Sequence, residues 1–158
     1  MAQIQVGQTA PDFSLYDSDK KLVTLSEHRG SNVLLLFFPL AFTSVCTAEL
    51  CSMRDNLKLY EGLNTTSFGI SVDSLYSLKK FKEEQAINFA LLSDFNKEVS
   101  KAYDCIYEEF GYGMRGVSKR SAFLIDNSGV VQYAEVLENA ALQPDFEKIQ
   151  VKLRDLSK

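Results

Sequence analysis

The most informative stretch of this sequence is residues 33–46, which read VLLLFFPLAFTSVC. Its first part, Val33–Phe38, is apolar at every position, as expected of a central strand that is covered on both faces. Pro39 ends the strand, because proline has no N–H for a ladder hydrogen bond. The stretch therefore predicts a buried strand followed by a short loop, and the loop leads to Cys46.

On both sides of this stretch, the apolar spacing alternates between period two and period 3.6, which is typical of α/β proteins. The order of elements, a βαβ half and then a ββα half, predicts a thioredoxin-like fold: a central mixed sheet flanked by helices, with an N-terminal β-hairpin extension. The expected elements are a hairpin of Phe13–Leu15 and Leu22–Leu25, a helix over Ser44–Gly62, a strand over Thr66–Val72, a helix capped by Ser74, a strand over Asn88–Leu92, a short helix capped by Asn96, a hairpin of Ala122–Asp126 and Val130–Val136, and a last helix with Phe146, Ile149, Leu153 and Leu156 on one face.

Length and composition limit the possible classes of protein. With 158 residues, 46% of them hydrophobic and 24% charged, we expect one globular domain over residues 1–158. A net charge of −4 with no basic block argues against binding to nucleic acid or to an anionic membrane. The apolar run Val33–Leu40 is far shorter than the roughly 20 residues that span a bilayer. Met1–Val6 has neither a basic nor an apolar leader region, so we expect a cytoplasmic protein.

Cys46 is the candidate nucleophile. Thr43 or Ser44 can cap a helix whose first turn contains this cysteine. A helix N-terminus carries unpaired N–H groups and a partial positive charge, and both favour the thiolate, which is the reactive form. The alternative is a plain buried cysteine, since Cys46 is in phase with the apolar Leu50 and Met53.

Cys51 follows Cys46 on the same expected helix. Five helical steps rotate it by about 140° and place the two Cα atoms about 8–9 Å apart. A disulfide needs about 4.4–6.8 Å, so the pair can bond only if part of the helix unwinds. Cys51 falls in phase with Asp55 and Lys58, and it is otherwise an incidental cysteine on the polar face.

Two motifs together resemble a known family. Pro39-x-x-x-Thr43-x-x-Cys46, after a buried strand and at the start of a helix, resembles the active-site signature of the peroxiredoxins, the thiol-specific antioxidant and alkyl hydroperoxide reductase family. Residues 119–126, KRSAFLID, resemble the second signature of that family, an arginine that opens a strand. The phrase around Pro39 is most similar to the small one-cysteine branch, whereas Cys51 resembles the resolving cysteine of the bacterioferritin-comigratory branch.

The resemblance implies a role for each motif residue. Cys46 would attack a peroxide and become a sulfenic acid, while Thr43 and Arg120 would stabilise the leaving oxygen. Pro39 would shield the sulfur, and Glu49 would hold the Arg120 guanidinium in place. From charge alone, Arg115, Lys119 and Arg120 are equivalent, and the resemblance selects Arg120.

The expected function is therefore that of a thiol-dependent peroxidase without metal, haem or flavin. It would reduce hydrogen peroxide and organic hydroperoxides, and a thioredoxin-like or small-thiol reductant would recycle it. The resemblance also implies a homodimer built near the active-site loop. The alternatives are a non-enzymatic redox-sensing or chaperone-like thioredoxin-fold protein that uses the same cysteine, and a scaffold that merely carries a thiol.

Three other patterns support only weak functional hypotheses. Residues 111–116 read GYGMRG, but they follow no strand and open no helix, so we interpret them as a loop and not as a nucleotide site. His28 is the only histidine and lies in a polar segment, so we expect it in solvent; with the three cysteines it could formally make a zinc site. Cys105 is expected in the core, with an alternate resolving role left open.

Overall fold

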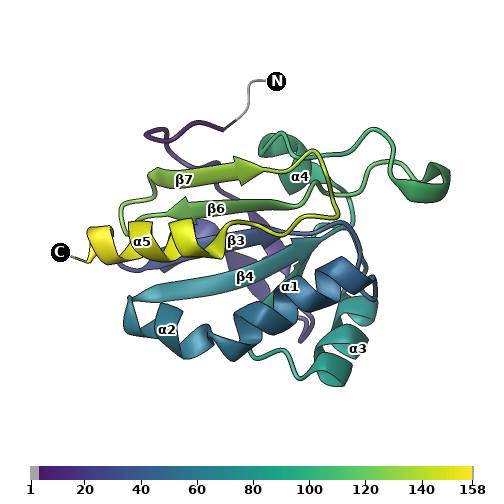
Figure 1. Cartoon of the computed structure of the whole chain (residues 1–158), viewed down its shortest axis with the longest axis horizontal. Helices are drawn as coiled ribbons and strands as arrows, with labels where there is room; N and C mark the ends of the chain where they lie inside the picture. Colours follow the sequence, from purple (N-terminus) through teal and green to yellow (C-terminus); the bar gives the residue numbers. More distant parts are fainter. Residues whose placement is uncertain (1–3, 158) are drawn as a thin grey trace.

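A computed structural model describes residues 4–157 and shows a mixed β-sheet with helices on both of its faces (Figure 1). Residues 1–3 and 158 lie outside the described residues, and with them the first part of the segment Met1–Val6 and both ends of the expected domain 1–158. The helices that face the viewer in Figure 1 include α1, α2 and α5, while α4 lies behind the sheet.

The central sheet has the strand order β5-β4-β3-β6-β7. Its first three strands are parallel to one another. Strand β6 pairs antiparallel with β3, and β7 pairs antiparallel with β6, so the predicted mixed sheet is confirmed. The strands are β3 (Asn32–Phe37), β4 (Thr65–Ser71), β5 (Ala90–Ser93), β6 (Ser121–Ile125) and β7 (Val131–Val136).

The central strand β3 contributes to two hydrophobic cores. Leu34 and Leu36 point to one face, and Leu35 and Phe37 point to the other, because successive side chains of a strand alternate. All of these side chains are buried, as the continuous apolar run predicted. The helices that pack on the first face are α1 (Ser44–Asp55), α2 (Leu57–Gly62), α3 (Leu75–Gln85) and α5 (Phe146–Leu156), and α4 (Glu98–Ala102) packs on the second face.

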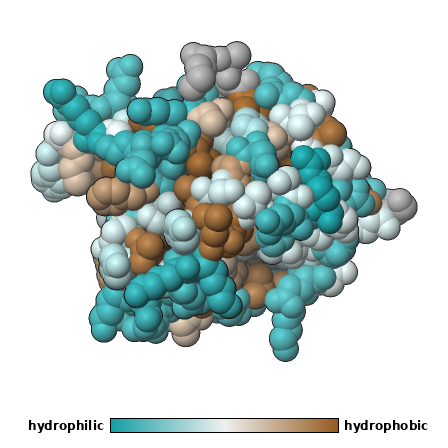
Figure 2. Space-filling model, turned by 180° about the vertical axis from the view of Figure 1, so that it is seen from behind, coloured by the Kyte–Doolittle hydropathy of each residue, from teal (hydrophilic) through white to brown (hydrophobic). Residues whose placement is uncertain are grey.

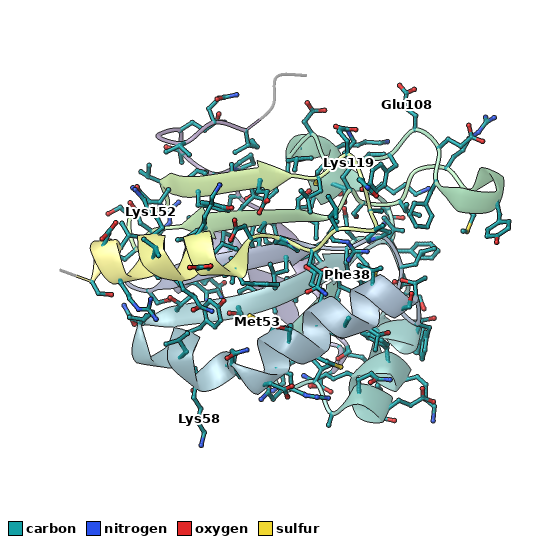
Figure 3. The ribbon with its side chains drawn as sticks, in the orientation of Figure 1. Phe38, Met53, Lys58, Glu108, Lys119 and Lys152 are labelled. Atoms are coloured by element: carbon teal, nitrogen blue, oxygen red, sulfur yellow. The ribbon has the colours of Figure 1, made fainter. Side chains whose placement is uncertain are left out.

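Helix α1 packs on the sheet over Gly69 of β4. A Cβ on Gly69 would lie 2.7 Å from the Leu91 side chain of β5, so a larger residue would have to displace Leu91. It would lie 3.6 Å from the Leu50 side chain of α1, which is an ordinary contact distance. Figure 3 shows Met53 of α1 and Phe38 between this helix and the strands, and Lys58 pointing away from them. The register that buries Met53 and Leu50 also buries Cys46.

The predicted helix over Ser44–Gly62 is two helices. Asn56 has φ −112° and ψ 11°, which ends α1 and starts α2. Its side chain donates a hydrogen bond to the Ser52 carbonyl at 2.9 Å. Asparagine competes in this way with the helical backbone pattern, and this explains why the helix breaks here.

The two predicted hairpins are confirmed. Strands β1 (Ser14–Tyr16) and β2 (Leu22–Thr24) pair antiparallel, and the Asp17 carboxylate accepts the Asp19 and Lys21 N–H groups in their turn. The single-turn helix η1 (Leu25–His28) follows. In the β6–β7 hairpin, Asp126 does the same for the N–H groups of Ser128 and Val130.

One helix cap was predicted correctly and another was wrong. Ser74 accepts the Ser77 N–H and caps α3 as expected. Asn96 does not cap α4: the N-cap position is Lys97, with φ +65°, and the Asp94 carboxylate accepts the N–H groups of Val99 and Ser100 at 3.1 and 2.7 Å. Asp94 is buried and lies three residues before the N-cap position. Its carboxylate accepts the two N–H groups that an N-cap side chain would usually accept.

Residues 111–116 form an exposed loop between α4 and β6, as expected, with the single-turn helix η2 (Gly111–Gly113) inside it. Within residues 4–157, none of the helices is long and apolar enough to cross a membrane.

Candidate active site

The site forms where the end of β3 meets the start of β6. These strands are antiparallel, and Phe37 at the end of β3 pairs with Ser121 at the start of β6. Arg120, directly before β6, therefore lies beside the loop that leads from β3 into α1. Alternation along β6 points Arg120 to the same face as Ala122, which is the face that α1 covers.

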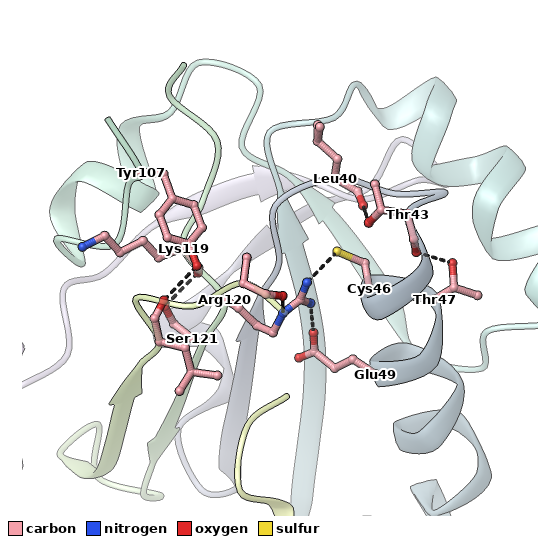
Figure 4. A network of polar contacts seen from close by, with 11 residues as sticks. Leu40, Thr43, Cys46, Thr47, Glu49, Tyr107, Lys119, Arg120 and Ser121 are labelled. Atoms are coloured by element: carbon pink, nitrogen blue, oxygen red, sulfur yellow. Dashed lines mark hydrogen bonds and ion pairs between the residues drawn. The ribbon is translucent and has the colours of Figure 1, made fainter. Parts of the chain in front are cut away.

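Three side chains predicted from sequence are in direct contact (Figure 4). Arg120 Nη2 lies 3.2 Å from Cys46 Sγ, and Arg120 Nη1 lies 2.6 Å from Glu49 Oε1. The Arg120 and Glu49 side chains are 2% and 0% exposed, and Cys46 is also fully buried. Cys46 and Glu49 lie three residues apart on α1, so they project from neighbouring positions of one helix face.

Burial and charge act against each other in this cluster. Burial raises the pKa of the Glu49 carboxyl to about 7, although Arg120 acts to lower it. Burial alone would lower the pKa of the Arg120 guanidinium, but the Glu49 carboxylate and the Cys46 sulfur raise it above its ordinary value. Arg120 therefore stays charged at the centre of the cluster. The second oxygen of Glu49, Oε2, is buried and has no hydrogen-bond partner among the described residues.

Arg120 is held on its other sides by backbone groups. Its Nε donates to the Ala140 carbonyl at 3.0 Å, and its own carbonyl accepts the Leu137 N–H at 2.9 Å. The Tyr107 hydroxyl donates to the Leu137 carbonyl at 2.8 Å and so fixes the segment that follows β7. Sequence reasoning missed Ala140 and Tyr107, because a carbonyl acceptor carries no residue signature and tyrosine is common in cores.

Thr43 stands at the start of α1 but does not cap it with its side chain. Its backbone has the extended N-cap conformation, with φ −88° and ψ 153°. Its hydroxyl donates to the Leu40 carbonyl at 2.8 Å, and its carbonyl accepts the Thr47 hydroxyl at 2.8 Å. The hydroxyl proton is donated to the Leu40 carbonyl, so Thr43 Oγ1 acts toward a ligand as a hydrogen-bond acceptor. The sequence predicted a donor here.

The loop between β3 and α1 has an unusual backbone. Pro39, the second residue after β3, is buried. Phe42 adopts φ +69°, a left-handed conformation that residues other than glycine rarely occupy. Its ring, which is 52% exposed, contacts the Phe81 ring of α3 at 5.2 Å between centroids.

The other two cysteines have different surroundings. Cys51 lies on α1 and is half-buried against the core, with Sγ 3.6 Å from Gln85 Oε1 at the end of α3, and not on a fully polar face as expected. Cys105 is fully buried in the core on the opposite face of the sheet from Cys46. Burial raises the pKa of the Cys105 thiol. All three cysteines are free.

The weaker sequence patterns do not converge on this site. His28 ends the short helix η1 and packs on the Phe68 ring at 5.1 Å, so it is partly covered and not in open solvent. Among residues 4–157, no group of three or more His, Cys, Asp or Glu side chains is placed to hold a metal ion.

Comparisons with known proteins identify the family of this chain. The model of the AhpC/TSA family matches residues 6–134. The chain is 41% identical to alkyl hydroperoxide reductase E of Mycobacterium tuberculosis over 136 residues, covering 84% of this chain and 86% of the relative. It is 34% identical to the putative peroxiredoxin bcp of Haemophilus influenzae, covering 99% of this chain and all of the relative.

A solved structure with the same fold is a cysteine-to-serine mutant of PrxQ from Xylella fastidiosa, with a TM-score of 0.88, 27% identity and full coverage of both chains. The two relatives are named as a hydroperoxide reductase and a peroxiredoxin, so a non-enzymatic role is not favoured. The chain belongs to the AhpC/TSA family and is a peroxiredoxin of the bacterial Bcp/PrxQ branch, a thiol-dependent peroxidase.

Proposed function

We propose that Cys46 is the residue that reduces the peroxide. Its thiolate attacks one oxygen of the peroxide, an S–O bond forms, and the O–O bond breaks. The sulfur is oxidised to a sulfenic acid, and the second oxygen leaves as hydroxide or alkoxide and takes up a proton from water. The single observation that carries this proposal is the contact of 3.2 Å between Arg120 Nη2 and Cys46 Sγ.

Arg120 stabilises negative charge at both stages of this step. Its guanidinium favours the thiolate before the attack and the departing oxygen during it. Glu49 is a positioning residue, because its contact of 2.6 Å fixes the orientation of the guanidinium fork. The interaction is strong because all three groups are buried, so water screens none of them.

The start of α1 completes the peroxide site. The N–H groups of a first helical turn have no partners within the helix, so those around Cys46 can donate hydrogen bonds to the oxygen atoms of the peroxide. Thr43 Oγ1 accepts the peroxide O–H and sets the direction of the O–O bond relative to the sulfur. Pro39 lies buried beside the loop and shields the sulfur from water.

Cys51 is the resolving residue of this proposal. Its thiol attacks the sulfenic sulfur of Cys46, a disulfide forms, and water leaves. Both cysteines lie within the continuous helix α1, where residues five apart are too distant to bond, so the helix must unwind around them. Cys105 is a poor alternative, since it lies on the other face of the sheet and burial keeps its thiol neutral.

A dithiol reductant of the thioredoxin type, or a small thiol, then reduces the disulfide. Hydrogen peroxide and alkyl hydroperoxides are the proposed substrates, in line with the alkyl hydroperoxide named in the mycobacterial relative. Because the cycle depends on a pool of reduced thiols, we place the enzyme in the cytoplasm.

A homodimer is proposed from the exposed aromatic side chains near the active-site loop. Phe42 in that loop, Tyr76 at the start of α3 and Phe95 after β5 are each more than half exposed. The space-filling view from behind also shows separate hydrophobic areas among hydrophilic side chains (Figure 2). Leu75, Tyr76 and Phe95 together line one shallow, largely apolar pocket, and contiguous exposed apolar surface is typical of interaction sites.

Turnover of the Cys46→Ser variant tests the proposal. With peroxide and a thiol reductant, the parent protein should consume peroxide catalytically, and Cys46→Ser should show no more than background, since a serine hydroxyl is not ionised near neutral pH. Retained turnover in that variant would mean that another residue carries the reaction.

A further inference from the structure

Asp73 joins the active-site loop to the neighbouring strands. It follows β4, and β4 is parallel to β3, so the carboxyl ends of both strands meet at one edge of the sheet. Asp73 Oδ2 accepts the Ala41 N–H at 2.9 Å and the Ser71 hydroxyl at 2.6 Å. The Asp73 carbonyl accepts the Ser93 hydroxyl at 2.6 Å, so the residue is also tied to the end of β5.

The Ala41 N–H belongs to the same peptide unit as the Leu40 carbonyl. A peptide unit is planar and trans, so its N–H and C=O point in opposite directions and turn together. The Leu40 carbonyl is the acceptor of the Thr43 hydroxyl. By holding the N–H end of this unit, Asp73 sets the direction of its carbonyl, and the carbonyl sets the direction of the Thr43 hydroxyl.

The loop needs such a restraint. Phe42, between Ala41 and Thr43, has φ +69°. A residue other than glycine keeps this conformation only where its surroundings hold it there. The Phe42 ring packs on Phe81, and the hydrogen bond from the Ala41 N–H to Asp73 is the polar contact that holds the backbone directly before Phe42.

We propose that Asp73 is a positioning residue for peroxide reduction, which acts through the Leu40–Ala41 peptide unit on Thr43. In this arrangement the Thr43 proton is always directed at Leu40, so Thr43 Oγ1 is preset to accept the peroxide O–H. The inference rests on the proposed function, in particular on the role of Thr43. Asp73 touches neither Cys46 nor Arg120 in the described contacts, so it orients the peroxide and leaves the thiolate unaffected.

The test is a double-mutant cycle between Asp73 and Thr43, read by the rate of single-turnover oxidation of the reduced protein by hydrogen peroxide. Asp73→Ala should slow this rate by roughly 10- to 100-fold, as expected for a misplaced substrate. In a Thr43→Val background, Asp73→Ala should slow the oxidation rate by less than about 3-fold, because the hydroxyl that Asp73 positions is already absent. Asp73→Asn retains an acceptor oxygen and should stay within about 3-fold of the parent.

A second readout separates positioning from a general structural effect. Alkylation of Cys46 by iodoacetamide, which depends on the thiolate but not on Thr43, should be unchanged in Asp73→Ala. The inference is overturned if Asp73→Ala slows oxidation equally in the parent and Thr43→Val backgrounds, or if Asp73→Ala oxidises at the parental rate. Slower alkylation of Cys46 in Asp73→Ala would also overturn it. If Asp73→Ala does not fold, Asp73→Ser takes its place, because its shorter side chain cannot reach Ala41.

The Thr43→Val variant by itself tests the role of Thr43 in the proposed function, independently of Asp73. If Thr43→Val alone reacts with peroxide like the parent, the role given to Thr43 is wrong whatever Asp73 does. If Thr43→Val is slowed and Asp73→Ala is not, only the role given to Asp73 is wrong.

Discussion

Arg120 and Glu49 form an ion pair of 2.6 Å in which both side chains are almost completely buried. A buried pair of this kind is costly to assemble, and it becomes more costly when one partner is removed. The same guanidinium contacts the third member of the cluster: Glu49 holds one of its nitrogens, and the other, Nη2, lies 3.2 Å from Cys46 Sγ.

Replacing Arg120 should therefore slow the first chemical step. We expect Arg120→Met to slow peroxide attack by about 10²- to 10³-fold, the usual loss for one electrostatic contact. Single-turnover oxidation of the reduced protein by hydrogen peroxide measures this loss. Arg115→Met, in the exposed loop, is the matched control and should behave like the parent. A parental rate of oxidation in Arg120→Met would show that another residue supplies the positive charge.

The raised pKa of Glu49 predicts a pH-dependent stability. The carboxyl has a pKa of about 7 in the folded protein against 4.5 without the fold, so between these values the folded state holds a proton that the unfolded state has released. The free energy of unfolding should then decrease as the pH rises from 4.5 to about 7, by at most about 1.4 kcal/mol per pH unit from this group.

Urea unfolding of the parent and of Glu49→Gln at several pH values isolates this contribution. The glutamine variant cannot titrate at this position, so it should gain stability relative to the parent across that window and keep the difference above it. A difference that does not change with pH would show that Glu49 is ionised throughout.

Thr43 should matter for its hydroxyl and not for its shape. Thr43→Val keeps the shape and should slow peroxide attack by about 10²-fold, the cost of a misaligned reactant. Thr43→Ser should keep most of the activity. Thr47→Val is the control, since the Thr47 hydroxyl donates only to the Thr43 carbonyl among the described contacts. Equal losses in Thr43→Val and Thr43→Ser would indicate a packing role.

Cys51 should act only after the first step. Cys51→Ser should react with one equivalent of peroxide at nearly the parental rate, but its sulfenic acid should persist and be driven more readily to sulfinic acid. In the parent, hydrogen exchange over α1 should accelerate on oxidation, because the helix must unwind to bring Cys46 and Cys51 together. Cys105→Ala is the control. Parental turnover of Cys51→Ser with every reductant would make Cys51 a bystander.

Much of this fold follows from local patterns. The run Val33–Phe38 predicted a central strand because both of its faces are covered, and the structure buries every one of its side chains. The boundary at Asn56 and the cap of α4 were not predictable in the same way. Both depend on a hydrogen bond between one side chain and the backbone: Asn56 donates to the Ser52 carbonyl, and Asp94 accepts the N–H groups that Asn96 was expected to cap.

The site was only partly predictable from the sequence, for a related reason. The position of Cys46 in a first helical turn is local information, whereas Arg120 lies 74 residues away and was selected by resemblance alone. Asp73 was missed because its partner is a backbone N–H of a distant loop. A carboxylate two residues after a central strand was the available signal, and it is a weak one.

The most direct test of the central claim is mass spectrometry of the reduced protein after one equivalent of hydrogen peroxide, with peptide mapping of the product. The account predicts first a gain of one oxygen atom at Cys46, trapped by a sulfenic-acid reagent. Loss of water should then give a Cys46–Cys51 peptide and a protein that is two hydrogen atoms lighter than its reduced form. Oxygen found first on Cys51 or Cys105, with Cys46 unmodified, would contradict it.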